Sequence, residues 1–222
     1  MTRLRILGQR IQACIDRGGI RTFSQGRPQL QSRLDATHRW LDAVVIGEKL
    51  CPFAASVRED SKLRLVASEA QDAEAVISEV ASEATLLVGC DPAMGPASGP
   101  RPETTLVVLD PSLSCLASWQ DFVRLSWRLQ AEAIRAQGFE EALQIVLFHP
   151  LAVHSSYAEG LPDAADFTIR SPFPTVHLLR EADVLKAVKA YPESHEIPSR
   201  NKAKLRAQGL ASCEARLEEA IG

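Results

Sequence analysis

The stretch Leu143-Gln-Ile-Val-Leu-Phe-His-Pro150 decides the fold class. Its first six residues form a nearly continuous apolar run, which is typical of a strand whose two faces are both covered by other layers. His149 and Pro150 end the run, because proline cannot donate a hydrogen bond to a strand ladder. A similar run, Thr104–Leu109 (TTLVVL), comes earlier in the chain. The two runs predict buried strands of an α/β domain.

Helical patterns alternate with the predicted strands. The short stretch 63–67 (LRLVA) predicts a strand, and Asp72 then stands where it would cap a helix whose apolar residues recur every three or four positions. Ser118 stands at the start of a further helix, which Gly138 ends. This alternation favours right-handed crossovers between strands.

The pattern extends in both directions. A helix capped by Asp35 is expected over residues 36–50, and the stretch 175–180 (TVHLLR) predicts the last strand. Asp183 is expected to cap a short helix, and two polar helices are expected around Gly209. The chain therefore predicts a small, mostly parallel sheet of about four strands with packed helices and a C-terminal helical tail.

Length and composition bound the domain organisation. The chain has 222 residues, 45% of them hydrophobic, which suffices for one well-buried core. Charged or turn residues interrupt every hydrophobic run before the roughly 18 residues that a membrane-spanning helix needs, so a soluble protein is expected. We expect a leader over residues 1–34, a single α/β domain over 35–209 and a helical tail over 210–222.

The first 34 residues are strongly basic. They hold seven of the 25 lysines and arginines but one of the 28 acidic residues, Asp16. Such a segment is typical of an organelle transit peptide and predicts the mitochondrial matrix or plastid stroma, or the cytoplasm if it is not cleaved. The alternative is a basic arm that stays disordered or docks on a partner.

The rest of the chain is acidic, which disfavours binding of nucleic acid through a broad basic face. Five cysteines without a C-x-x-C pair argue against a disulfide framework and a zinc knuckle, and fit a reducing compartment. The Pro/Gly-rich stretch 91–102 and the stretch 151–174 predict loops, the second long enough to be functional or partly mobile.

Five short strings together resemble one protein family. They are Leu50-Cys51-Pro52-Phe53-Ala54, Phe148-His149-Pro150, Arg170-Ser171-Pro172-Phe173-Pro174, His177-Leu178-Leu179-Arg180-Glu181 and Ile197-Pro198-Ser199-Arg200-Asn201. In this order they resemble the proteobacterial and plant family known as domain of unknown function 1415, over about residues 36 to 209. The resemblance implies kinship and no particular reaction, cofactor or substrate.

Three residues are candidates for catalysis. Cys51 could act as a nucleophile if a cation such as Arg170 or Arg200 lowered its pKa, or it could be a small buried hydrophobic residue. His149 follows directly on a strand, where ligands gather in parallel sheets. His177 could line a pocket with His149. For either histidine, the alternative is a structural residue whose hydrogen bonds are satisfied by the fold.

Three arginines are candidates for binding an anion, namely Arg170, Arg180 and Arg200. A guanidinium group can bind a carboxylate or phosphate in a bidentate manner, and the prolines around Phe173 would stiffen the segment that carries Arg170. The alternative is salt bridging to nearby acids. The residues that follow the arginines in the same strings complete the set of candidate substrate-binding residues: Ser171, Glu181 and Asn201.

These residues suggest a domain that binds a small anionic metabolite, with a cysteine or histidine as acid, base or nucleophile. Whether it is an enzyme stays open. The alternative is a non-catalytic binding or assembly module for a protein partner, a metal or haem. A zinc site of His149, His154 and His177 is a weaker possibility, because the spacing is poor. No metal is predicted, and the cofactor is unknown.

Overall fold

The computed structural model describes four ranges of the chain, 27–59, 61–89, 102–154 and 162–222. Parts of three predicted segments lie outside them: the first 26 residues of the leader, the Pro/Gly-rich loop up to residue 101, and residues 155–161 of the long loop. No helix in the described ranges has the length and apolar character needed to cross a membrane.

A four-stranded sheet forms the centre of the molecule, with the strand order β1-β2-β4-β3. Its strands are β1 (Leu63–Ala67), β2 (Thr104–Val108), β3 (Leu143–Phe148) and β4 (Thr175–Arg180). β1 and β2 pair in parallel, whereas β4 runs antiparallel to both of its neighbours. The α/β class and the number of strands are as predicted, but the sheet is mixed rather than mostly parallel.

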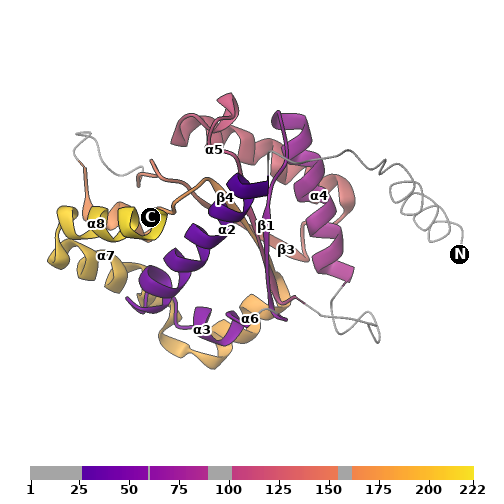
Figure 1. Ribbon diagram of the computed structural model, residues 1–222. Helices are drawn as coiled ribbons and strands as arrows, with labels where there is room; N and C mark the ends of the chain where they lie inside the picture. The colour runs from indigo at the N-terminus through magenta and orange to yellow at the C-terminus, as the bar shows by residue number, and fades with distance from the viewer. Residues whose placement is uncertain (1–26, 60, 90–101, 155–161) are drawn as a thin grey trace, which may run out of the picture.

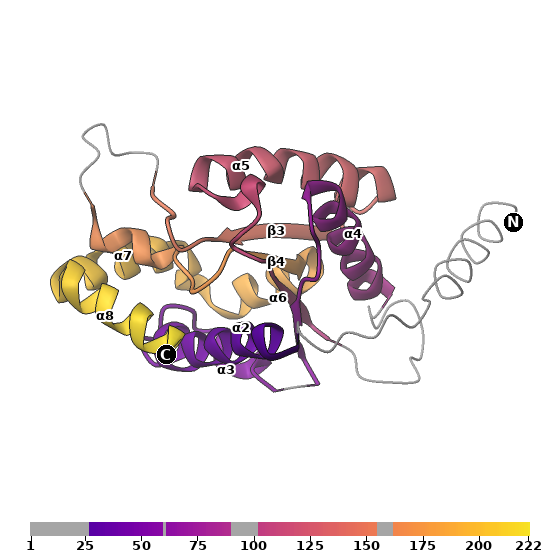
Figure 2. The ribbon, with the colours of Figure 1, turned by 45° about the horizontal axis from the view of Figure 1, so that its top comes forward.

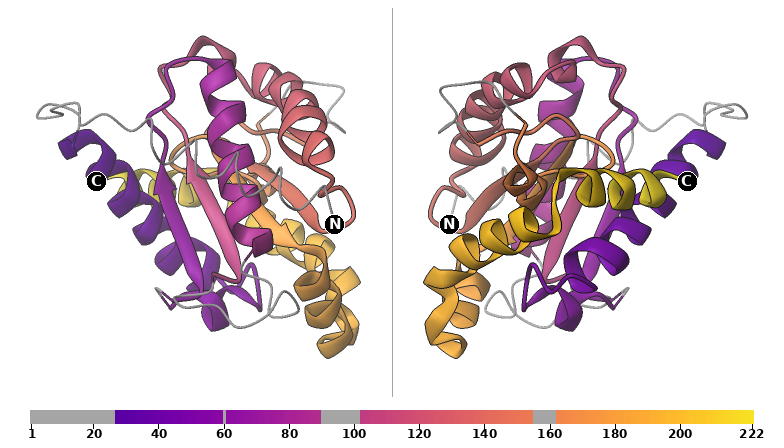
Figure 3. Two further views of the ribbon diagram at one scale, coloured as in Figure 1. Left: turned by 90° about the vertical axis from the view of Figure 1, so that its right-hand side faces the viewer. Right: turned by 90° about the vertical axis from the view of Figure 1, so that its left-hand side faces the viewer.

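Helices cover both faces of the sheet, so that the molecule has three layers (Figures 1 and 3). One face packs against α4 (Ala73–Gly89) and α5 (Trp119–Arg128), which continues as the π-helical η4 (Leu129–Ile134). The other packs against α2 (Arg27–Trp40) with its π-helical continuation η1 (Leu41–Ile46), and against the C-terminal helices. The C-terminal helices are α7 (Ile197–Gln208) and α8 (Leu210–Ile221).

Strand alternation sends side chains into two separate cores. Val107, Val176 and Leu178 are fully buried against α4 and α5, while Leu106 packs with Trp40 of α2. Each apolar side chain that is buried in this way stabilises the fold by about 2 kcal/mol, so the two cores are the main source of stability. This two-sided covering explains the apolar run in β2, which is buried along its whole length. β3 is less buried than predicted, because it lies at the edge of the sheet, where Leu143 is buried and the other five residues are half-buried.

Short helices connect these elements and lie mainly at the ends of the sheet. They are α3 (Ala54–Val57), η3 (Ser114–Leu116), η5 (Arg135–Gln137), η6 (Ala164–Thr168), α6 (Glu181–Ala190) and η7 (Pro192–Glu196). Figure 2 shows α3 and α6 on the side of the sheet away from α5.

Three predicted helix ends are confirmed. The Asp72 carboxylate accepts a hydrogen bond from the amide of Ala75 at 2.8 Å, and the Ser118 hydroxyl accepts one from the amide of Asp121 at 3.1 Å. Both capping bonds satisfy amides that the first helical turn leaves without partners. Gly138 ends η5 with φ +76°, a left-handed conformation that glycine adopts without strain.

Two predicted caps are wrong. α2 begins at Arg27, so Asp35 lies within the helix, where it accepts a hydrogen bond from the Gln31 side chain at 2.7 Å. α6 begins at Glu181, directly after β4, and Asp183 lies in its first turn, paired with Arg180. Aspartate often caps helices, but each of these two pairs with a nearby side chain instead, Asp35 with Gln31 and Asp183 with Arg180.

The described part of the predicted leader is packed into the domain. Arg33 of α2 is buried, and its guanidinium group donates to the carbonyl of Ser68 at 3.1 Å. Arg39 of the same helix donates to the main-chain carbonyls of Ala220 and Ile221 near the C-terminus, both at 2.9 Å. These bonds hold α8 against α2. Residues 27–34 and the helical tail therefore belong to the same packed unit as the sheet.

The antiparallel β4 separates two groups of predicted site residues. The carboxyl ends of β1, β2 and β3 meet the amino end of β4, and we call this the His149 end. The opposite end of the sheet, where β4 finishes and α6 begins, we call the Arg200 end. In an all-parallel sheet the residues that follow every strand would have met at one edge.

Candidate functional site

His149 is buried at the His149 end of the sheet. Its Nε2 is 2.9 Å from the carbonyl oxygen of Leu116, and its Nδ1 accepts the amide of Leu151 at 3.0 Å. Its ring lies 5.7 Å from the ring of Phe122, and burial lowers its pKa. A neutral imidazole protonated on Nε2 satisfies both contacts, which is a structural arrangement.

Arg170 also lies at the His149 end, with its donors directed into the protein. Its Nε donates to the carbonyl of Ala152 at 3.0 Å, and its guanidinium carbon is 4.6 Å from the centroid of the Phe167 ring. One terminal nitrogen is 3.8 Å from the carboxylate of Asp166, which is 1% exposed. The next residue, Ser171, is fully buried and donates to the carbonyl of Phe173 at 2.6 Å.

His154 faces the same region and has its own partners. Its amide donates to Asp166 at 2.9 Å, and its Nε2 is 2.9 Å from the hydroxyl of Thr168. Within the described ranges, no three His, Cys, Asp or Glu side chains lie close enough together to hold a metal ion. The zinc site of His149, His154 and His177 is therefore wrong.

His177 lies on the opposite face of the sheet from His149. Its Nε2 is 2.6 Å from the hydroxyl of Thr104, which donates to the carbonyl of Leu178 and so is left to accept from the imidazole. Its ring is 6.2 Å from that of Phe148. Burial lowers the pKa of His177 to about 4, so the ring is neutral at physiological pH. Because the two histidines face different helix layers, the predicted shared pocket does not form.

Arg180 ends β4 and is almost completely buried. Its Nη1 donates to the carbonyls of Leu87 and Pro102 at 3.2 and 2.9 Å, and its Nε donates to Asp183 at 2.7 Å. These bonds tie β4 to the end of α4 and to the start of β2. The next residue, Glu181, accepts a hydrogen bond from the Gln144 side chain at 2.5 Å. Arg180 thus stabilises the fold and has no open face for a ligand.

Asn201 fixes the segment that contains Cys51. Its side-chain amide is buried in α7 and donates to the carbonyl of Leu50 at 2.5 Å. Cys51, the next residue, is partly exposed and is a free thiol. The contact holds the Leu50-Cys51-Pro52-Phe53 segment against the first turns of α7.

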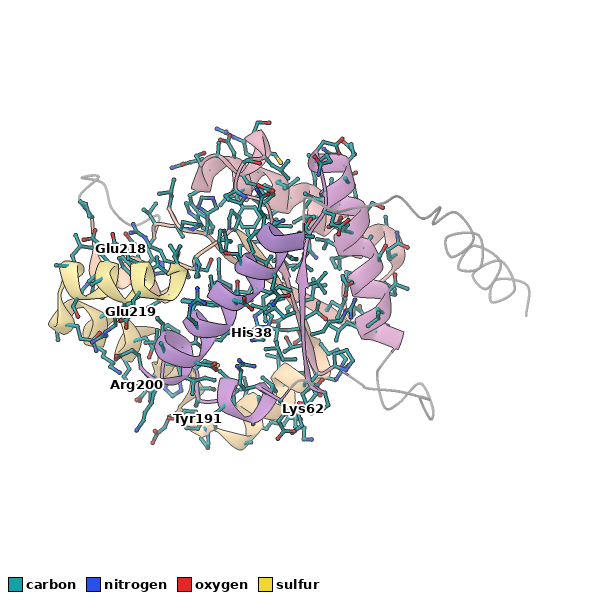
Figure 4. All side chains as sticks on the ribbon, viewed as in Figure 1. His38, Lys62, Tyr191, Arg200, Glu218 and Glu219 are labelled. Carbon is teal, nitrogen blue, oxygen red and sulfur yellow. The ribbon has the colours of Figure 1, made fainter. Side chains whose placement is uncertain are left out.

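Arg200 differs from the other two candidate arginines. It is exposed on α7, and its Nη1 donates to the Tyr191 hydroxyl at 3.1 Å. The Tyr191 ring in turn packs edge-on against Phe53, with the centroids 6.0 Å apart. Figure 4 shows Tyr191 and Arg200 at the same corner of the molecule.

A family model described as a protein of unknown function (DUF1415) matches residues 32–215. The chain belongs to this family. No curated protein and no solved structure matches it.

The five strings on which the DUF1415 resemblance depends fall into two spatial groups. Residues 148–150 and 170–174 lie at the His149 end, where the amide of Leu109 donates to the carbonyl of Pro174 at 2.8 Å. Residues 50–54 and 197–201 meet at the Arg200 end through Asn201 and Leu50. The string 177–181 spans β4 and finishes there. The structure therefore divides the residues that the sequence had placed in one site.

Tyr191 is the residue of this region that the sequence alone did not single out. It belongs to none of the five strings, and it lies between α6 and η7, where its side chain bridges Phe53 and Arg200. Its position just before Pro192 and nine residues before Arg200 was a weak signal of proximity.

Proposed function

We infer that the protein binds a small anion, a carboxylate or a phosphate, at the Arg200 end of the sheet. The observation that carries this proposal is the state of the Arg200 guanidinium group. Its hydrogen-bond partner among the described residues is the neutral hydroxyl of Tyr191, which uses one donor. A guanidinium group carries five donors, so an anion can still be bound in a bidentate manner.

The other candidate arginines support this choice by contrast. Arg180 donates hydrogen bonds to two main-chain carbonyls and to Asp183. Arg170 donates to the carbonyl of Ala152 and lies beside Asp166 and the Phe167 ring. A ligand at Arg180 would have to displace bonds that the fold already contains, and a ligand at Arg170 would compete with the buried Asp166 carboxylate for a side chain that is 16% exposed.

Packing around Arg200 favours binding because it reduces the flexibility that an anion would otherwise have to remove. The Asn201 amide holds α7 to the carbonyl of Leu50, and the Phe53 ring supports Tyr191. Cys51 lies in the chain between Leu50 and Phe53, the two residues that these contacts hold in place. Cys51 is therefore our candidate for the reactive group beside the anion, because both ring nitrogens of His149 are engaged and His177 faces Thr104.

Calorimetric titration of the full chain with inorganic phosphate and with succinate tests the proposal. We expect saturable binding of at least one of them, reduced about tenfold or more in Arg200→Met, since a bidentate charged contact contributes about 1.5–3 kcal/mol. Arg124→Met is the matched control, because Arg124 is a similarly exposed arginine on α5, paired with Asp121 at 2.7 Å.

Two results would contradict the proposal. One is the absence of saturable binding for both anions, and the other is an equal loss of affinity in the Arg200 and Arg124 variants. The role of Cys51 is tested separately by mass-mapped alkylation. Saturating anion should slow the modification of Cys51, and an unchanged rate would remove the thiol from the site.

A further inference from the structure

β1 forms one edge of the sheet, and its outer side has no strand beside it among the described residues. The carbonyl of Lys62 and the amide of Ser68 bond to the β2 side of the strand. Because successive residues of a strand direct their main-chain groups to alternate sides, Leu65 and Ala67 direct theirs to the outer side. β1 lies at the near edge of the sheet in Figure 1, with α2 on one side and α4 on the other.

A shallow hollow of about 300 Å³ opens beside this edge, on the α4 side. Val66 and Val107 form its apolar floor, and one turn of α4 forms its wall with Ser78, Glu79, Ser82 and Glu83. A strand added to β1 would direct every second side chain into the hollow. The hollow is large enough for one long side chain.

The carboxylates of the hollow differ in their partners. Glu83 forms a bidentate salt bridge with Arg64, at 2.6 and 2.9 Å. Glu79 accepts hydrogen bonds from the hydroxyl of Ser68 and from the amide of Glu69, both of them neutral groups. No cation of the described residues pairs with Glu79 or with Glu69. The hollow therefore carries negative charge that the protein itself leaves unbalanced.

We propose that the β1 edge binds an extended segment of a partner protein that carries an arginine or lysine. Main-chain groups of the segment pair with Leu65 and Ala67 as an additional strand, the mode called β-augmentation. The aliphatic part of the basic side chain lies on Val66, and its charge meets Glu79. This site is separate from Arg200 and does not depend on the anion that we place there.

Charge argues against a second copy of this chain as the occupant. A symmetric antiparallel pairing of two β1 strands would place both α4 helices on the same face of the joined sheet. The joined sheet would then carry both acidic hollows on one face, and the pairing would supply no complementary basic side chain to either of them.

A labelled octapeptide of alternating valine and arginine tests the proposal by fluorescence anisotropy with the full chain. We expect it to bind, and we expect its counterpart with glutamate in place of arginine not to bind. Glu79→Gln should weaken binding about threefold to fivefold, as expected for one partly exposed charge pair. Glu74→Gln is the control, because Glu74 lies on the same helix but pairs with Arg128 at 2.8 Å.

Main-chain pairing is tested on the peptide, so that folding of the protein is not at risk. N-methylation of every second residue, in each of the two registers, should abolish binding in one register and leave it in the other. Equal binding of both methylated peptides, no binding of the arginine peptide, or no difference between the Glu79 and Glu74 variants would overturn the proposal. A protein that is dimeric by sedimentation and becomes monomeric in Leu65→Pro would overturn it too, in favour of self-pairing.

Discussion

The two ends of the sheet differ in the direction of their polar groups. At the His149 end, both nitrogens of His149 are bonded to the main chain and Arg170 is bonded to Ala152. At the Arg200 end, the guanidinium group of Arg200 is exposed and touches a tyrosine hydroxyl. A polar residue after a strand is therefore not enough to indicate a site. What distinguishes a candidate site is hydrogen-bonding capacity that the fold has not already used.

Replacing Arg180 should have the largest effect on stability. It tests whether this buried arginine is structural although it lies at the same end of the sheet as the exposed Arg200. Arg180→Met should lower the free energy of unfolding by about 3–4 kcal/mol, because it leaves the carbonyls of Leu87 and Pro102 buried without their donor. Urea unfolding measures this loss. Arg180→Lys keeps the charge and should recover part of it, and a loss below about 1 kcal/mol in Arg180→Met would mean that this arginine is not structural.

His149 tests whether the His149 end is structural. His149→Phe keeps an aromatic ring against Phe122 but removes both ring nitrogens, so we expect a loss of about 2–3 kcal/mol from the unpaired carbonyl of Leu116 and amide of Leu151. Anion binding, measured by the titration described above, should be unchanged. A variant of normal stability that no longer bound the anion would reverse our assignment of the two ends.

The neutral histidines predict how stability depends on pH. The pKa of His177 is about 4 in the folded protein and near 6.5 in the unfolded chain, so below pH 6.5 the unfolded chain binds a proton that the folded protein does not. Stability should therefore fall as the pH is lowered from 7 to 5, by about 2 kcal/mol from this residue. Burial also lowers the pKa values of His149 and His154, which adds to the effect in the same direction.

Urea unfolding at a series of pH values between 7 and 5 measures this slope. The pKa values of Glu48 and Asp110 are lowered in the folded protein, so these carboxyls take up their protons at a lower pH than the histidines do. His177→Gln keeps a donor for Thr104 and should flatten the slope. An equally steep slope in that variant would show that His177 titrates normally in the folded protein.

Arg200 gives the smallest expected effect on stability and sharpens the contrast between the two ends most directly. Arg200→Met should change the free energy of unfolding by less than about 0.5 kcal/mol, because the side chain is exposed and has one hydrogen bond to a surface tyrosine. Thermal unfolding of this variant beside Arg180→Met measures the difference. A large loss for Arg200→Met would identify it as a second structural arginine.

The sequence predicted most elements because their signals are local. The bounds of β1, β3 and β4 agree with the stretches 63–67, 143–148 and 175–180, since apolar runs and β-branched residues act within a few positions. The start of α2 was missed for the same reason. Residues 27–34 have few apolar positions, and their place in the domain depends on the buried contact between Arg33 and Ser68, which is distant in the chain.

The direction of β4 could not be predicted from local patterns. The connection from His149 to Pro174 is long enough either to cross to the far end of the sheet or to return at the same end. It returns, with the amide of His149 bonded to the carbonyl of Ile169, so that β4 enters antiparallel between β2 and β3. That one choice divides the predicted site between two ends.

The amino-acid sequence by itself determined the α/β class, the four strands, several helix ends and the membership in the DUF1415 family, because each depends on patterns within short stretches. The tertiary structure decided which candidate residues meet, and which of the three arginines is exposed with donors that a ligand can reach. The physical reason is that a guanidinium or imidazole group has the same composition whether its hydrogen bonds end on the protein or on a ligand. Only the arrangement of distant main-chain carbonyls and amides around it determines which of the two applies.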